Sequence, residues 1–337
     1  MQNEEDGAPA KVEIVSGIRA TGSLTIGNYV GAVKQFIELQ DAGHHPLIFV
    51  ADLHVLTDRE PDVAIKYRKE VVSDYLGLGM DPDRCDIFIQ SQIAPQVFTL
   101  MSYLLRLISV SELLRVPTLK DKLKSNQRSE AANALLAAYP VLMAADILLQ
   151  RARVVPVGED QIPHMEVTRL LARRFNDRYG KVFPIPQPAQ LKPVRILGLR
   201  GSGKMSKSIP EEAIFLTDDA AAAVRKVTKA KTAIAGEMNE ALESNFSLAF
   251  GLAPDATVVQ DIERFRQLHM SGENVMGDFK KLLGSLVGEF LSDFQRRRAL
   301  VTKDPSYIRD ILASGLKIAR ENGTETLNLV NEALWRE

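Results

Sequence analysis

The chain has 337 residues, of which 45% are hydrophobic, and its formal net charge is −1. This length and composition suffice for about two domains, each with a buried core. The near-zero charge excludes a protein that holds nucleic acid by bulk attraction, so any RNA contact has to be local. The sequence contains no run of about 18 apolar residues and no cationic-then-apolar leader, which predicts a cytoplasmic protein. Cys85 is the only cysteine, which excludes an internal disulfide and a cysteine-based metal site and predicts a small buried side chain.

Residues 12–200 alternate β-rich runs with amphipathic stretches, which is the pattern of βα units wound into a parallel sheet. The predicted strands are Val12–Ile18, Pro46–Leu53, Asp86–Gln90, Val154–Val157 and Val194–Leu199. The predicted helices between them are Asn28–Gln40, Val63–Leu78, Val97–Leu107, Val141–Leu149 and Gln161–Phe175. After Pro210, helical periodicity dominates at Ala220–Lys229, Asp278–Arg298, Tyr307–Arg320 and Thr326–Trp335. We therefore expect a disordered tail at 1–11, a Rossmann-like, doubly wound α/β domain at 12–210 and an all-helical domain at 211–337.

Two local basic clusters stand out against the neutral total. One consists of Arg225, Lys226, Lys229 and Lys231, and the other is the run Arg296–Arg298. Each cluster is compatible with a solvated helix face or with a local RNA contact.

The loop from Arg19 to Asn28 follows the first predicted strand and precedes a helix. Free backbone N–H groups and the positive end of the helix dipole at such a corner suit a phosphate. Gly27 would let a base or a phosphate approach the backbone, while Thr25 and Asn28 offer short polar side chains. Many strand–turn–helix corners look alike, so this loop alone is also compatible with an ordinary turn.

A second polar loop, KMSKS at 204–208, leaves the last predicted strand and lies between Gly203 and Pro210. Lys204 and Lys207 are three residues apart on this loop. Two lysines so placed can close over a polyphosphate and neutralise the charge of departing pyrophosphate.

The two loops together resemble the two signature motifs of the class I aminoacyl-tRNA synthetases, the first as TIGN at 25–28 and the second as an unsubstituted KMSKS. The resemblance implies ATP as a substrate, with Mg²⁺. The catalytic residues that it implies are Thr25, Asn28, Lys122, Lys204 and Lys207. The ATP-binding residues that it implies are Arg19, Ala20, Thr21, Gly27, Asn28, Gly158, Glu159, Asp160, Ile196, Lys204, Met205, Ser206, Lys207 and Ser208.

A competing phosphate motif overlaps the second loop. Residues 198–204 fit the first seven places of a P-loop, but Met205 stands where a serine or threonine should hold magnesium. Pro210 also interrupts the long helix that a P-loop requires. Both departures argue against a P-loop ATPase.

An apolar predicted helix carries the single acid Asp146, which shares a face with Tyr139 and Met143. A buried carboxylate needs a donor. That donor is either an internal partner such as an arginine or part of a ligand. A large apolar ring with one N–H, held against Met143 and Tyr139, would be an indole.

The stretches YPVLMAAD at 139–146 and VPVGEDQ at 155–161 resemble the tryptophanyl branch of the class I synthetases more than the tyrosyl branch. The resemblance implies that Asp146 accepts the indole N–H. The stretch ADLH at 51–54 also matches the family pattern, and the resemblance implies that His54 lies near the pocket. A histidine at the end of a strand can also have no functional role. The other tryptophan-binding residues that it implies are Tyr139, Met143, Ile147 and Gln161.

Three departures from the family pattern concern the nucleotide side of the site. Arg19 stands where the family often has glutamine, which adds a charge. The stretch RVPTL at 115–119, before Lys120 and Lys122, differs from the usual pattern, and Pro117 should end the preceding helix. The segment from Ile196 to Lys204 is about one residue shorter than in some relatives, which could shift an adenine contact at Ile196.

The resemblance implies an enzyme that activates L-tryptophan with ATP, releases pyrophosphate and transfers tryptophan to tRNA(Trp). It further implies a homodimer whose C-terminal helices bind the anticodon. A tyrosyl-type synthetase and a non-tRNA nucleotidyltransferase with the same phosphate motifs remain as alternatives.

Overall fold

The computed structural model describes residues 11–120, 133–158, 161–189, 194–201, 203–206 and 209–336. The predicted tail at 1–11 therefore lies almost entirely outside the described residues. Among the residues that are described, no helix is both long and apolar enough to cross a membrane.

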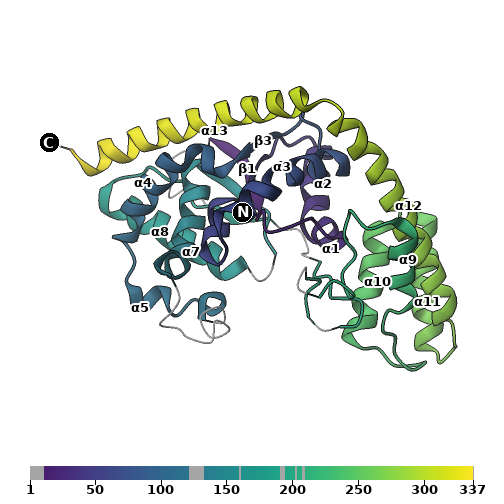
Figure 1. Cartoon of the computed structure of the whole chain (residues 1–337). Helices are drawn as coiled ribbons and strands as arrows, with labels where there is room; N and C mark the ends of the chain where they lie inside the picture. The colour runs from purple at the N-terminus through teal and green to yellow at the C-terminus, as the bar shows by residue number, and fades with distance from the viewer. Residues whose placement is uncertain are drawn as a thin grey trace.

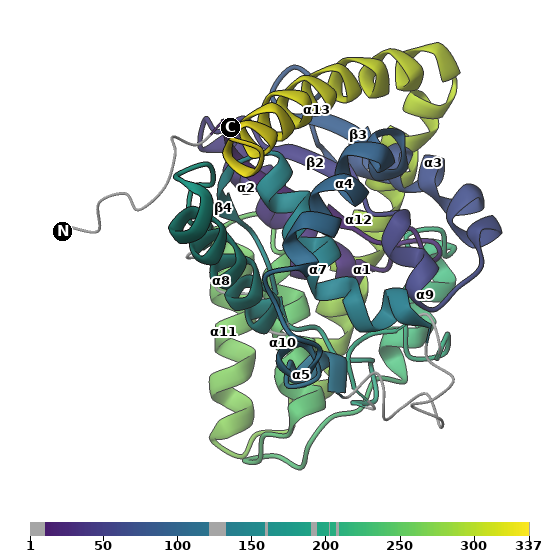
Figure 2. The same cartoon turned by 90° about the vertical axis from the view of Figure 1, so that its left-hand side faces the viewer.

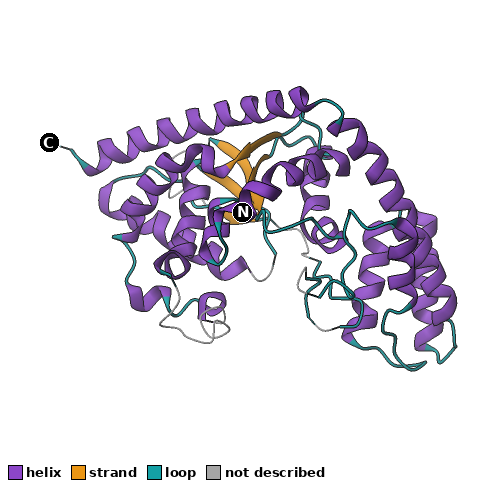
Figure 3. Ribbon diagram, viewed as in Figure 1, coloured by secondary structure: helices purple, strands orange, loops and turns teal. Residues whose placement is uncertain are grey.

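Five parallel strands form one sheet in the order β3-β2-β1-β4-β5, which lies at the centre of the larger lobe (Figure 3). The strands are β1 (Val12–Ile18), β2 (Leu47–Val50), β3 (Asp86–Ile89), β4 (Ala152–Val155) and β5 (Gln187–Pro188). The chain winds outward from β1 in one direction to β2 and β3, and in the other direction to β4 and β5. Such a reversal of winding creates a crevice at the carboxyl ends of the two central strands, and ligands of open α/β sheets bind there.

Alternate residues of the sheet pack against helices on opposite faces. Leu47 and Phe49 belong to one buried cluster, with α4, α7 and α8, whereas Ile48 and Val50 belong to another, with α2, α3 and α12. The helices of this part are α1 (Ile26–Asn28), α2 (Lys34–Asp41), α3 (Pro61–Leu78), α4 (Ala94–Leu105), α5 (Val110–Leu113), α7 (Ala134–Leu149) and α8 (Ile162–Tyr179). The short π- and 3₁₀-helical turns are η1 (Tyr29–Val33), η2 (Leu53–Thr57) and η3 (Gln90–Ile93). The predicted doubly wound α/β fold is therefore confirmed.

After residue 209 the described part of the chain contains helices and loops but no strand, and α9, α10, α11 and α12 gather in a second lobe (Figure 1). The helices are α9 (Ala220–Thr228), α10 (Glu240–Leu252), α11 (Ala256–Met270), α12 (Met276–Thr302) and α13 (Pro305–Leu334). The last helix returns to the first lobe and lies across the edge strand β3 (Figure 2). At this crossing a side chain on Gly315 would meet the carbonyl oxygen of Ile87 at 2.2 Å, so only glycine allows the contact. The domain boundary near residue 210 stays a prediction. The final helix, α13, follows this boundary in the sequence but packs on the sheet of the first lobe.

The basic run Arg296–Arg298 serves two purposes in the structure. Arg296 and Arg297 pair with Asp293 on the surface of α12. Arg298 instead turns toward α3, where its Nε donates to Asp74 Oδ1 at 2.5 Å. Burial raises the pKa of the Asp74 carboxyl, and the nearby Arg298 charge opposes that rise. The third arginine therefore joins the two lobes and is not a free RNA contact.

Arg298→Ala should lower the free energy of unfolding by about 3 kcal/mol, because it leaves the buried Asp74 carboxylate without its counter-charge. Arg296→Ala is the matched control: its side chain is 74% exposed, and the change should stay within about 0.5 kcal/mol. Urea unfolding of both variants measures the difference. Equal stability of the two variants would contradict the structural role of Arg298.

Candidate active site

A cavity of about 380 Å³ opens at the carboxyl ends of β1 and β4, the crevice that the strand order predicts. Ligand pockets of enzymes typically have volumes of roughly 300–1,000 Å³. The predicted site residues that line this cavity are Arg19, Thr21, Asn28, His54, Tyr139, Met143, Ile147, Gly158, Gln161 and Lys204. Residues from both signature loops and from the predicted tryptophan pocket therefore share one cavity.

Other predicted site residues are described by the structure but do not line the cavity. These are Ala20, Thr25, Gly27, Asp146, Ile196, Met205 and Ser206. A further group, Lys122, Glu159, Asp160, Lys207 and Ser208, lies outside the described residues. The ligand contacts assigned to both groups stay predictions.

The first signature loop forms a helix cap. The Asn28 side chain accepts from the Thr25 backbone at 2.9 Å and from the Thr25 hydroxyl at 3.0 Å, and the Thr25 hydroxyl accepts from the Asn28 backbone at 3.3 Å. This reciprocal capping box fixes the first turn of α1. Thr25 is buried, whereas Asn28 also faces the cavity. The π-helical turn η1 follows directly, and its Gly31 and Ala32 line the cavity as well.

The second signature loop begins with a tight turn in place of the predicted strand Val194–Leu199. Leu197 and Lys204 form an isolated antiparallel bridge, and the backbone N–H of Met205 donates to the Ile196 carbonyl at 2.8 Å. Gly201 and Gly203 close this turn with φ angles of 81° and 119°, a conformation that favours glycine. The turn brings Lys204 to the cavity.

Gly27 is the point at which the two loops touch. A side chain on Gly27 would meet the Met205 Cβ at 3.2 Å and the Ile196 Cβ at 3.5 Å. The space that a glycine leaves here is thus filled by the second loop, whereas the sequence suggested that a base or a phosphate would use it. Backbone hydrogen bonds from Ile26 to Ile214 and from Leu216 to Leu24 join the first loop to the segment that follows the second loop.

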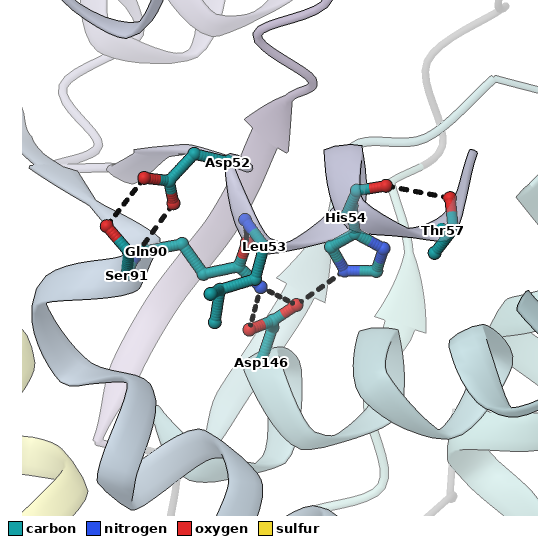
Figure 4. Close-up of polar contacts among 7 residues, drawn as sticks. All are labelled: Asp52, Leu53, His54, Thr57, Gln90, Ser91 and Asp146. Carbon is teal, nitrogen blue, oxygen red and sulfur yellow. Dashed lines mark hydrogen bonds and ion pairs between the residues drawn. The ribbon is translucent and has the colours of Figure 1, made fainter. Parts of the chain in front are cut away.

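Asp146 lies on α7 between Met143 and Ile147, which line the cavity, and two side chains hold its buried carboxylate (Figure 4). The Gln90 amide donates to Oδ1 at 2.7 Å and to Oδ2 at 2.8 Å, and His54 Nε2 lies 2.8 Å from Oδ2. Gln90 is itself fixed, because its carbonyl oxygen accepts from the Leu53 backbone at 3.0 Å. The carboxylate therefore has internal donors, and neither of them is an arginine.

The protonation of Asp146 depends on these donors. Burial raises the pKa of the Asp146 carboxyl above its ordinary value, and the hydrogen bond and charge of His54 and the hydrogen bond from Gln90 oppose that rise. Both donors therefore favour the ionised, acceptor-only form. His54 touches both Asp146 and the cavity, so it is more than an ordinary strand-end histidine.

Arg19, the departure from the family pattern, pairs with Asp58 through both terminal nitrogens of its guanidinium. Asp58 directly follows η2, the turn that carries His54. The positive charge that Arg19 brings to the cavity is therefore balanced by the neighbouring Asp58 carboxylate.

Sequence reasoning missed Gln90, Asp58, Thr118 and His164. Each of them acts on a predicted residue from a distant part of the chain, for example Gln90 on Asp146 and His164 on Tyr139. A polar residue at the end of a buried strand was the one local indication for Gln90. Nothing local distinguishes the other three.

The family model of the tRNA synthetases class I (W and Y) matches residues 8–290. The chain therefore belongs to the class I tRNA synthetases of the tryptophan and tyrosine family. It is 34% identical over 330 residues to the tryptophan–tRNA ligase of Treponema pallidum, with 96% of each chain covered. It is 36% identical over 324 residues to the tryptophan–tRNA ligase of Porphyromonas gingivalis, covering 93% of this chain and 96% of that one. Within the family it thus groups with the tryptophan–tRNA ligases, ahead of the tyrosyl-type and nucleotidyltransferase alternatives.

Solved structures agree with this assignment. The tryptophanyl-tRNA synthetase of Mycoplasma pneumoniae superposes with a TM-score of 0.84 at 28% identity, covering 96% of this chain and 97% of that one. That of Campylobacter jejuni, complexed with ADP and tryptophan, gives a TM-score of 0.75 at 27% identity, covering 95% of this chain and 98% of that one.

Proposed function

We propose that the chain activates L-tryptophan with MgATP to tryptophanyl-adenylate and then transfers tryptophan to tRNA(Trp). The observation that carries this proposal is that residues of both signature loops, Asn28 and Lys204, line the same cavity as His54, which contacts Asp146. The Campylobacter jejuni structure with ADP and tryptophan supports the choice of ligands.

Tryptophan would place its indole among the apolar side chains of the cavity, including Met143 and Ile147. An ionised carboxylate offers about four acceptor positions. Gln90 and His54 leave room on Asp146 Oδ1 for one more donor. We assign that position to the indole N–H, and Gln161 to the ammonium group at the other end of the amino acid.

ATP would occupy the half of the cavity lined by Arg19, Thr21, Asn28, Gly158 and Lys204. The tryptophan carboxylate is already ionised, so it attacks the α-phosphorus without a protein base. The protein contributes by positioning the reactants and by stabilising the charge that develops on pyrophosphate. We assign the stabilisation of pyrophosphate to Lys204, which lines the cavity, and Lys207 and Lys122 join it in this proposal.

The anticodon of the tRNA would contact the helical lobe, α9 to α12. The enzyme would act in the cytoplasm, where its tRNA substrate is used. The exposed basic residues Arg225, Lys229 and Lys231 offer phosphate contacts there.

We also propose a homodimer formed through α4 and α5. Phe98 and Leu105 lie seven residues apart on α4, and Val110 and Leu114 lie four apart at α5, so each pair shares a helix face. All four side chains are exposed, Val110 to 72%. Large exposed apolar side chains gathered on one side of a molecule are typical of protein interfaces.

Val110→Asp should weaken the dimer by about 100-fold, because it buries an unpaired charge in the interface. Val259→Asp on α11 is the control, since Val259 is also an exposed valine but lies on the other lobe. Sedimentation equilibrium measures both. A Val110→Asp variant that is as dimeric as the control would contradict this interface.

The function itself is tested by charging tRNA transcripts. The enzyme with ATP and tryptophan should charge a tRNA(Trp) transcript and leave a tRNA(Tyr) transcript uncharged. Charging of tRNA(Tyr) with tyrosine, or no charging of tRNA(Trp), would refute the proposal.

A further inference from the structure

Two short turns, η2 and η3, follow the neighbouring parallel strands β2 and β3 and hold each other in place. Asp52, the residue before η2, accepts from the Ser91 backbone N–H at 2.8 Å through Oδ1 and from the Ser91 hydroxyl at 2.5 Å through Oδ2. In the opposite direction, the side-chain oxygen of Gln90 accepts from the Leu53 backbone N–H at 3.0 Å. Each turn thus binds the other with one side chain, and we call these three hydrogen bonds the turn clamp.

The turn clamp carries both donors of the Asp146 carboxylate (Figure 4). The Gln90 amide belongs to η3 and His54 to η2, and their nitrogens lie 2.7–2.8 Å from the Asp146 oxygens. Asp52 and Gln90 are only 4% and 1% exposed, so the clamp is shielded from water. The direction in which Asp146 presents its remaining acceptor position therefore depends on how the two turns are held.

The charge of Asp52 does not explain its place near Asp146. Burial raises the pKa of the Asp146 carboxyl, and the Asp52 charge adds a smaller rise, which works against the ionised, acceptor-only form. Arg68 Nη1 lies 3.7 Å from Asp52 Oδ2 and balances that charge without a short hydrogen bond. What Asp52 supplies is a pair of acceptor oxygens in one side chain, which serve the Ser91 backbone and hydroxyl together.

We infer that Asp52 is a positioning residue for recognition of the indole N–H, because it holds η3 so that Gln90 keeps Asp146 turned toward the ring. This inference deepens the proposed function and rests on it. Hydrogen bonds weaken steeply when their angle departs from linearity, so a Gln90 amide that is free to turn would leave the indole N–H with a poorer acceptor. The apolar contacts that we assign to Met143 and Ile147 come from α7 and do not involve the clamp.

Two ligands separate the positioning of Asp146 from a general disturbance of the pocket: L-tryptophan and β-(3-benzothienyl)alanine, in which a sulfur replaces the ring N–H. Asp52→Ala should raise the tryptophan dissociation constant about 10-fold and change those of the benzothienyl analogue and of ATP by less than about twofold. Pyrophosphate exchange should show a raised KM for tryptophan with little change in kcat. Asp52→Asn should restore most of the affinity, because its amide can accept from the Ser91 backbone and donate to the Ser91 hydroxyl.

A milder variant keeps the test decisive if Asp52→Ala fails to fold. Ser91→Ala removes one hydrogen bond of the clamp, and it should raise the tryptophan dissociation constant about threefold while that of the analogue stays unchanged. Combined with Asp52→Ala, it should add little further loss. Ser73→Ala is the matched control, because the hydroxyl of this buried serine donates to the Lys69 carbonyl within α3. It should change the binding of neither ligand.

Equal losses of both ligands in Asp52→Ala and Ser91→Ala, or unchanged tryptophan binding in both variants, would overturn the inference. An Asp52→Asn variant that binds tryptophan as weakly as Asp52→Ala would also overturn it, as would a wild type that binds both ligands equally well. The proposed function fails separately, if the wild-type protein neither binds nor activates tryptophan.

Discussion

Lys204→Ala is expected to slow tryptophanyl-adenylate formation by about 10²- to 10³-fold, the usual effect of removing one group that stabilises developing charge. Lys204 lines the cavity at the end of a glycine-closed turn, so its position is set by backbone bonds and not by the ligand. In the proposed function its ammonium stabilises the departing pyrophosphate and does not contact the amino acid. The tryptophan dissociation constant should therefore change by less than about threefold.

Single-turnover kinetics of adenylate formation measure this effect. Lys317→Ala is the control, because Lys317 is an exposed lysine on α13. Normal activation with weakened tryptophan binding in Lys204→Ala would assign this lysine to the wrong substrate.

Asp146→Ala is expected to raise the tryptophan dissociation constant by about 10- to 150-fold, since a charge-assisted hydrogen bond is worth ~1.5–3 kcal/mol. ATP binding to the free enzyme should change little. The variant also leaves the Gln90 amide and His54 without their acceptor. A loss of stability is therefore expected as well, and affinity has to be measured on folded protein.

A tryptophan analogue whose ring nitrogen carries no hydrogen separates the loss of the indole hydrogen bond from a general disturbance of the pocket. The analogue should bind the wild type more weakly than tryptophan does, by a similar factor, and its affinity should fall little further in Asp146→Ala. Additive losses would mean that Asp146 only supports the pocket wall. Equal binding of both ring forms by the wild type would remove Asp146 as the indole acceptor.

Much of the sheet was predictable because its first three strands are short runs rich in valine, isoleucine and phenylalanine. Val12–Ile18 matches β1 at both ends, and Asp86–Gln90 exceeds β3 by one residue. The predicted fifth strand, Val194–Leu199, was wrong: the sheet ends with Gln187–Pro188, and glycines turn the predicted stretch back on itself. Periodicity cannot distinguish a short sheet strand from such a turn.

Helix ends were harder to predict, because tertiary contacts keep a helix intact across residues, such as proline and glycine, that would end it locally. The predicted helix starts at Val141, directly after Pro140, yet α7 begins at Ala134 and continues through the proline, and the Asn133 side chain caps it. The two predicted C-terminal helices are one, α13. Gly323 lies inside α13, where the helix passes close to the Gln96 side chain: a Cβ atom at this position would lie 3.2 Å from it. Helices α10 and α11 were not predicted.

The site could be predicted as far as its residues belong to contiguous motifs. TIGN, KMSKS and the α7 helix face each carry a local pattern, and Asn28, Lys204 and Met143 do line one cavity. Their supports could not be predicted in this way. Gln90 and His164 come from separate elements, and only the fold brings them to Asp146 and Tyr139.

The central claim is that this cavity activates tryptophan, and ATP–pyrophosphate exchange with each of the twenty amino acids tests it most directly. We expect exchange with tryptophan, while phenylalanine, which has no ring N–H, should be about 10⁴-fold less effective because the buried acceptor would stay unpaired. A preference for tyrosine, or exchange that does not depend on any amino acid, would contradict the account.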